Sequence, residues 1–418
     1  MNKIVLDKIV KSSNLVKYFF HVNDSLSPYF KANYLFIQYD DDITSVPLSI
    51  LTIPFVNIMA GFSWLSDSTL FVDEIDKTYY YAFKRLKVAY NELHRVNFKG
   101  LFVPSRIVEN SFHKPNNESL LLFGGGVDCH TSFLRNRNTV SGIVNIYGWL
   151  NDIDEDSKVD KSDEAGTKYY ATSMGIVAHH VRSNFASLFA LSEIDDKLCN
   201  PAINTSFWYG LLHPMAFLSI SAPLAWKYQI PTLLIASSYT KDRADLHCAS
   251  FITTDSEFRF AENGHTIHDG FELNRQEKVE LLVNYQRSTD RPYIIQACSF
   301  NDHNCCSCEK CFRTITELVA EDADPRLFGF NEISGSLKDH WKGIVDRDVA
   351  LWGVAKESYF YYDYSAKRMK DNYFLYRGER KEFVDWFLNY DFADAKRKGL
   401  RKYYRKNFIK IIKRKLHL

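Results

Sequence analysis

The stretch Ser119-Leu120-Leu121-Leu122-Phe123-Gly124-Gly125-Gly126-Val127-Asp128-Cys129-His130-Thr131-Ser132 decides the fold that we expect for this chain. Residues 119–123 form a short apolar run typical of a buried strand, and a helix should begin at about Val127. The three glycines between them allow a tight turn whose backbone N–H groups point at one anion. Because a helix N-terminus adds partial positive charge, the segment predicts a phosphate-binding turn.

Other apolar runs repeat this alternation of strand and helix. We expect further strands at residues 34–39, 141–148, 232–236 and 293–297. Buried strands that alternate with helices predict an α/β protein with a doubly wound parallel sheet. Ligands of such sheets bind at the carboxyl ends of the strands, where Ser237 and Ser238 are expected.

Breaks in composition divide the 418 residues into three expected parts. Residues 1–115 predict an N-terminal α+β domain, with helical periodicity from Val72 onward. Residues 116–324 form the expected nucleotide-binding domain, and residues 325–418 a helical C-terminal region.

Composition favours a soluble protein of the cytoplasm, since 46% of the residues are hydrophobic and 25% are charged. The first residues lack the continuous apolar run of a secretory signal. Two long uncharged stretches, 43–66 and 198–226, contain prolines and polar residues, so we interpret them as buried helices rather than membrane spans.

The glycine turn differs from two well-known classes of phosphate-binding loop. A Walker loop needs a Gly-Lys-Ser/Thr sequence, which the turn lacks. A dinucleotide-binding fingerprint needs a third glycine where Cys129 stands, and it would set the Asp128 carboxylate against a pyrophosphate. Asp128 fits better if Mg²⁺ bridges it to the phosphates. A strand–helix turn that binds no ligand is the alternative.

The sequence from Gly124 to Cys129 resembles the Ser-Gly-Gly-x-Asp-Ser signature of the PP-loop ATP pyrophosphatases. The resemblance implies a loop that grips the ATP phosphates, with ATP split into AMP and pyrophosphate as a substrate is adenylated. The residues that it places around ATP are Gly124, Gly125, Gly126, Val127, Asp128, Cys129, Thr131 and Ser132. Gly124 and Cys129 replace the two serines of the signature, and Thr131 or Ser132 can supply a hydroxyl instead.

Five of the eight cysteines lie between Cys298 and Cys311. Four of them follow the pattern Cys298-x6-Cys305-x2-Cys308-x2-Cys311, which predicts a tetrahedral structural zinc site. Two ligands would come from the first turn of a helix and two from the loop before it. Buried free thiols and a catalytic persulfide are the alternatives.

The glycine turn and the cysteine pattern together resemble cyano-deazaguanine synthase-like proteins, which carry a structural zinc there. They also resemble the ATP-dependent glutamate epimerases that act on a UDP-muramoyl peptide. The resemblance covers residues 120–318, under half of the chain. It implies ATP, Mg²⁺ and Zn²⁺ as cofactors.

Two cations near a predicted helix start complete the candidate catalytic set. Arg275 and Lys278 are three residues apart and share a helix face, so they could neutralise a pyrophosphate leaving group beside Asp128. The alternative is a solvated, non-functional helix face.

The function expected from these motifs is adenylation of a carboxylate-bearing small molecule by ATP, followed by ligation, amidation or epimerisation. Such a reaction would suit the synthesis of a cell-surface glycan or peptidoglycan precursor. One alternative is a PP-loop enzyme that modifies tRNA or a nucleobase, by thiolation or deazaguanine-type chemistry. Another is a nucleotide-binding module without catalysis. Release of AMP and pyrophosphate separates the module from both enzymes.

The C-terminal segment 396–418 holds 11 Lys/Arg and no acidic residue. Removing these 11 from the chain's 52 basic residues leaves 41 against 51 acidic residues, a balance of −10. Apolar residues recur in the segment at helical spacing, namely Leu400, Tyr403, Tyr404, Phe408, Ile411, Ile412 and Leu416. This pattern predicts an amphipathic helix on an anionic membrane surface, at the inner face of the membrane. A helix docked on the acidic body and an RNA-binding tail are the alternatives, and nucleic acid is the less favoured partner.

Overall fold

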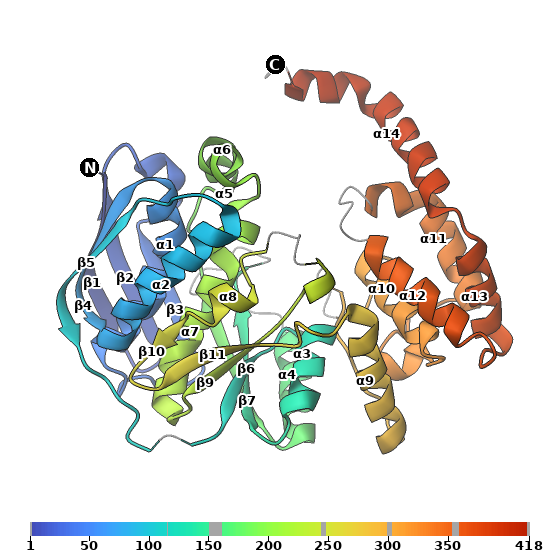
Figure 1. Ribbon diagram of the computed structural model, residues 1–418, viewed down its shortest axis with the longest axis horizontal. Coiled ribbons are helices and arrows are strands. Elements are labelled where there is room, and N and C mark those ends of the chain that lie inside the picture. The colour runs from blue at the N-terminus through green and yellow to red at the C-terminus, as the bar shows by residue number, and fades with distance from the viewer. Residues whose placement is uncertain are drawn as a thin grey trace. The chain divides into compact units, whose positions relative to one another are not determined.

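The computed structural model describes residues 2–114, 116–149, 161–243, 248–298, 303–352 and 359–415 (Figure 1). The chain forms two compact units. Unit 1 holds residues 1–124 and 128–272, and unit 2 holds residues 125–127 and 273–418. These units differ from the expected three-part division, because strands from both sides of residue 115 belong to one sheet.

Unit 1 is built on a sheet of eleven described strands. They are β1 (Asn2–Lys11), β2 (Leu15–Val22), β3 (Tyr34–Tyr39), β4 (Ser68–Asp76), β5 (Leu101–Val108), β6 (Ser119–Leu122), β7 (Val140–Tyr147), β8 (Val177–Ser183), β9 (Thr232–Ala236), β10 (Arg259–Phe260) and β11 (Gly264–Asp269). Their order is β10-β11-β9-β6-β7-β8-β3-β2-β1-β4-β5. The α/β class is therefore confirmed.

The sheet is mixed but mostly parallel. Strands β11, β9, β6, β7 and β8 pair in parallel, while β8–β3, β3–β2 and β2–β1 pair antiparallel. From β6 the chain adds β7 and β8 on one side, whereas β9 and β11 lie on the other side. The strand order thus reverses at β6, and the carboxyl ends of β6 and β9 flank the point of reversal.

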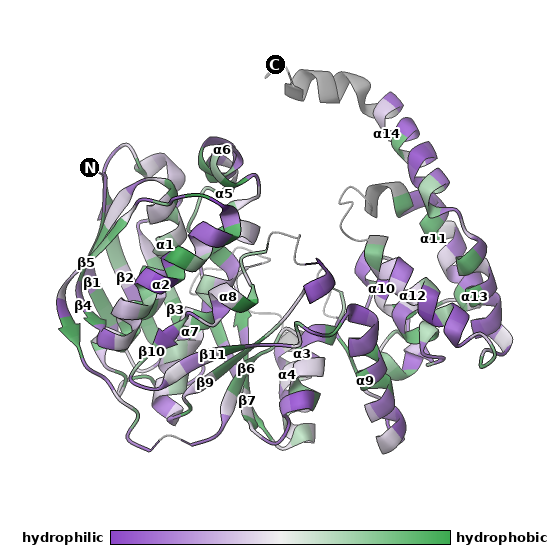
Figure 2. Ribbon diagram, viewed as in Figure 1, coloured by the Kyte–Doolittle hydropathy of each residue, from purple (hydrophilic) through white to green (hydrophobic). Residues whose placement is uncertain are grey.

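Helices cover both faces of the central strands. Leu120 of β6 packs in one apolar cluster with residues of α1 (Leu48–Leu65) and α7 (His213–Tyr228). The next residue, Leu121, packs in a second cluster with residues of α3 (Val127–Asn136) and α4 (Lys161–Met174). The hydrophobic colouring of these strands in Figure 2 reflects this two-sided burial.

Helix α1 carries the longest apolar run of unit 1. It is the one helix among the described residues that is long and apolar enough to cross a membrane, and 89% of it is buried inside the protein. Asn57, in its middle, donates to the Met215 carbonyl at 2.6 Å and accepts from the Tyr79 hydroxyl at 2.9 Å. These buried hydrogen bonds fit the packing of a core helix, as expected for the stretch 43–66.

Helix α2 (Lys77–His94) begins later than the sequence pattern predicted. Val72 and Ile75 lie in β4, so the expectation of helix from Val72 was wrong. The Asp76 side chain accepts from the Tyr79 backbone N–H at 2.9 Å and caps the helix there.

The shorter helical elements of unit 1 are Ser27–Tyr29, α5 (Leu191–Ile194), Asp195–Cys199, α6 (Asn200–Ile203), Trp208–Leu212, Lys241–Arg243 and α8 (Ile252–Asp255).

Unit 2 is helical in its described parts. Its elements are α9 (Arg275–Thr289), α10 (Glu309–Ala320), a 3₁₀ turn (Pro325–Phe328), α11 (Leu337–Trp352), α12 (Tyr359–Asp371), α13 (Gly378–Asn389) and α14 (Phe392–Lys415). The buried ring of Phe312 on α10 contacts the rings of Trp341, Tyr362 and Phe383, which come from α11, α12 and α13.

The expected strand at 293–297 is not formed. The backbone N–H groups of this segment bond to carbonyls of two turns: Tyr293 to Leu327 at 2.8 Å, Ile295 to Phe328 at 3.2 Å and Gln296 to Gly125 at 2.7 Å. The partners belong to a 3₁₀ turn and to the glycine turn. Because neither partner is a strand, no ladder of paired bonds can form.

Candidate functional site

The glycine turn joins β6 to α3, at the edge of the sheet where the strand order reverses. Gly125 has φ +74°, and a Cβ on it would lie 3.0 Å from the Cβ of Gln296. Its backbone conformation and its close neighbour therefore both require glycine.

Gly124 and Gly126 do not share these constraints. Neither has a positive φ. A Cβ on Gly124 would meet no described atom within 4 Å, and one on Gly126 would meet the Gln296 carbonyl oxygen at 3.9 Å. Folding therefore gives no reason for glycine at either position. Two glycines that the fold does not need leave the backbone open to close approach by a ligand.

The side chains that follow the turn divide between surface and core. Asp128 is half-buried in the first turn of α3, while Val127 and Thr131 are buried. Cys129 packs in the apolar cluster with Leu121 and Phe133. The Cys129 side chain thus contributes to the core on the α3 face of the sheet.

An aspartate that the sequence pattern did not single out connects three elements. Asp269, the last residue of β11, accepts from the Ser132 hydroxyl at 2.7 Å and from Arg135 Nε at 3.3 Å. Its backbone carbonyl accepts from the Ser237 N–H at 2.8 Å. The position of Asp269 at the carboxyl end of a strand is the signal that would have identified it.

The two predicted serines after β9 lie in different environments. Ser237 is buried and its hydroxyl donates to the Tyr239 carbonyl at 2.5 Å, whereas Ser238 is exposed. The structure therefore brings Ser132 and Ser237 together through Asp269.

The four predicted metal ligands of unit 2 converge. The sulfur atoms of Cys298, Cys305, Cys308 and Cys311 all lie within 4.8 Å of one another. Cys305 Sγ lies 3.6 Å from Cys298 Sγ and 3.9 Å from Cys311 Sγ. A tetrahedral site with metal–sulfur bonds of about 2.3 Å has sulfur–sulfur edges of roughly 3.8 Å. The cluster could therefore hold a metal ion such as zinc.

The surrounding loop fixes this cluster. The Asn304 side chain accepts from the backbone N–H groups of Ala297 and Cys298, at 2.9 and 3.2 Å, and donates to the Ile295 carbonyl at 2.7 Å. Cys308 is the N-cap of α10, so Cys308 and Cys311 lie in its first turn, as predicted.

The neighbouring thiols differ in acidity. Hydrogen bonding from the Cys311 thiol lowers the pKa of Cys308, because it stabilises the thiolate that binds a metal. Burial raises the pKa of Cys306 to about 11, so this thiol stays protonated at neutral pH. The hydrogen bond with Cys308 also raises the pKa of Cys311, so these shifts by themselves do not separate Cys306 from the predicted ligands.

Arg275 and Lys278 open α9 in unit 2. The Asn274 side chain caps this helix by accepting from the Glu277 N–H at 3.0 Å. Arg275 Nε donates to Glu317 Oε2 at 3.1 Å, and the Lys278 residue is only 2% exposed. The two cations are thus held inside unit 2, and the alternative of a solvated helix face does not apply to them.

Comparison of the chain with protein-family models, with curated proteins and with solved structures gives no match. The chemistry of the two candidate sites therefore has to be argued from their own geometry.

Proposed function

We propose that the protein binds ATP–Mg²⁺ at the glycine turn and transfers the adenylyl group to a carboxylate-bearing small molecule. Gly124 and Gly126 carry this proposal, because they are glycines that neither backbone conformation nor packing requires. They flank the one glycine that shapes the turn, and they lie where a parallel sheet reverses its strand order. Crevices at such points are the usual ligand sites of α/β sheets.

The groups around the turn suit a polyphosphate with its metal. The N-terminus of α3 supplies backbone N–H groups and a partial positive charge for the phosphates. Asp128, in the first turn of that helix, offers a carboxylate oxygen, which is the ligand type that Mg²⁺ prefers. Without the metal, the same carboxylate would repel the phosphates.

The chemistry proposed is a single displacement at the α-phosphorus of ATP. An oxygen of the acceptor carboxylate forms a bond to that phosphorus, while the bond to the pyrophosphate group breaks. The products are an acyl-adenylate and pyrophosphate. The protein contributes alignment of the reactants and neutralisation of the phosphate charge. A later attack on the acyl-adenylate would release AMP.

The metal in the cysteine cluster is proposed to be zinc with a structural role. Four thiolates close a tetrahedral coordination shell and leave no position for a substrate. This geometry favours a structural site over a sulfur relay, which needs an accessible cysteine. The zinc would tie the loop before α10 to its first turn.

Calorimetric titration with ATP–Mg²⁺ tests the nucleotide site. Asp128→Ala should abolish the magnesium-dependent part of ATP binding, while Asp73→Ala, which removes an exposed carboxylate from β4, should leave it unchanged. Mass spectrometry after incubation with ATP, Mg²⁺ and candidate carboxylates should then detect AMP and pyrophosphate. Equal ATP–Mg²⁺ binding by the parent and Asp128→Ala would show that the assignment is wrong.

A further inference from the structure

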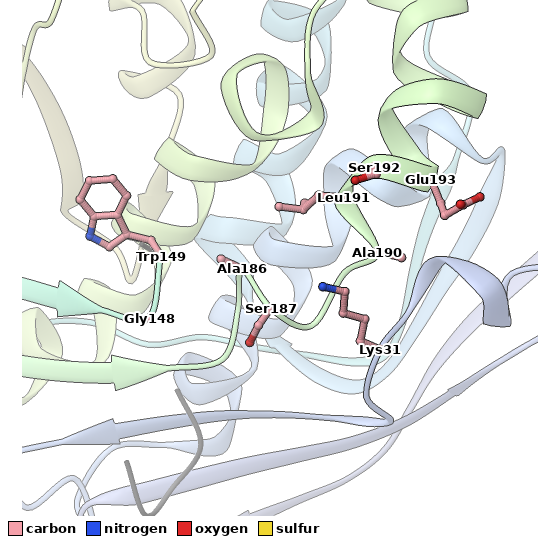
Figure 3. A pocket seen from close by; sticks show the side chains of 9 residues that line it. All are labelled: Lys31, Gly148, Trp149, Ala186, Ser187, Ala190, Leu191, Ser192 and Glu193. Atoms are coloured by element: carbon pink, nitrogen blue, oxygen red, sulfur yellow. The ribbon is translucent and has the colours of Figure 1, made fainter. Parts of the chain in front are cut away.

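A pocket of about 490 Å³ lies in unit 1 outside the carboxyl ends of β7 and β8 (Figure 3). Gly148 and Trp149 directly follow β7, and Ala186 and Ser187 follow β8. β7 pairs in parallel with β6, and β8 pairs in parallel with β7, so the pocket opens on the same edge of the sheet as Gly124. Its volume is typical of a small-molecule site.

Lys31 is the sole cation among the nine described lining residues. Its backbone N–H donates to the Leu188 carbonyl at 2.8 Å, which fixes its segment beside the loop after β8. Figure 3 shows its ammonium group directed toward the middle of the pocket, while the carboxylate of Glu193 points away. Glu193 pairs instead with Lys197 at 2.7 Å. Lys31 is an exposed residue, and its positive charge favours an anion beside it.

The opposite wall is aromatic. The Trp149 indole stacks on the Trp208 ring at 5.9 Å with an interplanar angle of 8°, and Phe217 meets it edge-on at 6.2 Å. These two ring contacts hold the Trp149 indole in place, yet the residue is still 38% exposed. Its uncovered surface offers a flat apolar platform for a ring.

Hydroxyl groups and small side chains complete the lining. Ser187 and Ser192 contribute hydroxyls, and Ala186 and Ala190 leave room between them. A cation, two hydroxyls and an aromatic platform together match a ligand that has a carboxylate, hydroxyls and a flat ring.

We infer that this pocket binds a sugar acid, with its carboxylate paired to Lys31, its hydroxyls bonded to Ser187 and Ser192, and one ring face on Trp149. The sugar acid is then the carboxylate-bearing acceptor of the adenylation. Its role as acceptor rests on the proposed function, whereas its binding in the pocket does not.

Saturation-transfer NMR on the full chain, without ATP, tests the pocket. Glucuronate is the probe, glucose is its uncharged counterpart, and benzoate is a flat carboxylate without hydroxyls. Glucuronate should bind saturably, and Lys31→Met should weaken it at least 10-fold, about the loss expected for one charge-assisted hydrogen bond. Lys84→Met, an exposed lysine on α2, should have no effect.

A second variant examines the aromatic wall. Trp149→Ala should also weaken glucuronate at least 10-fold, and its unfolding midpoint shows whether the chain still folds. Trp149→Phe keeps a ring and should restore most of the binding.

Three results would overturn the inference. They are glucuronate binding that Lys31→Met leaves intact, glucose binding as tight as glucuronate binding, and tighter binding of benzoate. If ATP–Mg²⁺ binds but glucuronate does not, the pocket assignment alone fails. If glucuronate binds as described but ATP–Mg²⁺ does not, the pocket assignment stands and the proposed function fails.

Discussion

Each residue of the glycine turn has its own reason to be there. Its Gly-Gly-Gly-x-Asp sequence predicted an anion-binding turn, but it could not separate a glycine that shapes the backbone from one that admits a ligand. That distinction depends on φ angles and on Gln296, which is 171 positions after Gly125 in the chain.

The distinction predicts opposite results for two alanine variants. Gly125→Ala forces a side chain into the left-handed region and should cost about 1–2 kcal/mol of stability. Gly126→Ala should change the free energy of unfolding by less than about 0.5 kcal/mol. It should nevertheless weaken ATP–Mg²⁺ binding about 10-fold or more, since its methyl group occupies the path of the phosphates.

Denaturant unfolding and calorimetry measure the two effects separately. A Gly126→Ala chain that binds ATP–Mg²⁺ like the parent would contradict the phosphate cradle, whatever its stability.

Asp41 predicts a pH dependence at the junction of β3, β8 and α7. It lies 2.9 Å from His179 Nδ1 and 3.3 Å from Lys227 Nζ. Burial raises its pKa, but hydrogen bonds from His179 and Tyr228 and the charge of Lys227 outweigh burial, so the pKa lies well below the usual range. A lowered folded-state pKa stabilises the protein above the unfolded pKa of about 3.9, and this contribution declines as the pH falls through the folded value.

Asp41→Asn should therefore lower the free energy of unfolding by about 1–3 kcal/mol at pH 7. This difference between variant and parent should become smaller below about pH 4. Urea unfolding of both proteins at several pH values measures this difference. Asp73→Asn, at an exposed carboxylate of β4, is the control. If the difference in free energy of unfolding stayed constant down to pH 3, Asp41 would contribute through its shape rather than its charge.

At the scale of elements, local pattern was enough where an element is set by its own residues. The strand β6, the start of α3 at Val127 and the strand β9 follow directly from apolar runs and glycine punctuation. The segment 293–297 shows the limit of local pattern, because β-branched and apolar residues predict a strand whether or not a partner strand exists. Partners are supplied by the rest of the chain.

The cysteine loop and α10 act together as one element. The spacing alone identified all four members of the cysteine cluster, since three of them recur at every third residue. Asn304, which organises the loop by bonding the backbone of Ala297 and Ile295, could not be recognised, because a lone asparagine in a polar run has many ordinary roles.

Removal of one ligand should release the metal and loosen the loop. Cys308→Ser should lower the zinc content from one ion per chain to none, and it should lower stability by several kcal/mol, since metal binding at such sites contributes folding free energy. Elemental analysis and thermal unfolding give the two readouts.

Cys306→Ser is the matched control for this experiment. Cys306 is adjacent and fully buried, but its thiol donates to the Asn304 carbonyl at 3.4 Å. This variant should keep its zinc. If Cys308→Ser stayed as stable as the parent and lost only activity, a catalytic persulfide would replace the structural metal.

At the scale of the molecule, the α/β class was predictable and the assembly of the sheet was not. Strands β3, β2 and β1 join β8 of the following segment, so residues 1–115 do not end the sheet at their own boundary. Such pairing depends on contacts between residues far apart in sequence, for which local periodicity gives no signal. The reversal of strand order at β6, which places the proposed ATP site, is likewise a property of the whole sheet.

The basic C-terminal helix sets the last prediction. Helix α14 begins at Phe392, whose ring stacks on Tyr362 at 5.6 Å, so its start is anchored in unit 2. In Figure 2 its described part alternates hydrophilic and less polar residues. The part of the predicted apolar stripe beyond Arg405, which includes Phe408 and Ile411, lies outside the described side chains. We propose that residues 396–418 bring the protein to an anionic membrane surface, where each nearby basic residue contributes about 1 kcal/mol.

Co-sedimentation with vesicles tests this role. The full chain should partition onto vesicles rich in phosphatidylserine, and a chain truncated after Asp394, which keeps the Phe392 anchor, should stay in solution. Leu400→Ser with Phe408→Ser retains all 11 basic residues and removes part of the apolar stripe. It should therefore reduce vesicle binding while leaving any purely electrostatic binding to RNA intact.

Equal sedimentation of the full and truncated chains would exclude the membrane role. Salt-sensitive RNA binding by both the full chain and the double variant, with no vesicle binding by either, would instead favour an RNA partner, because phosphate recognition alone does not need the stripe.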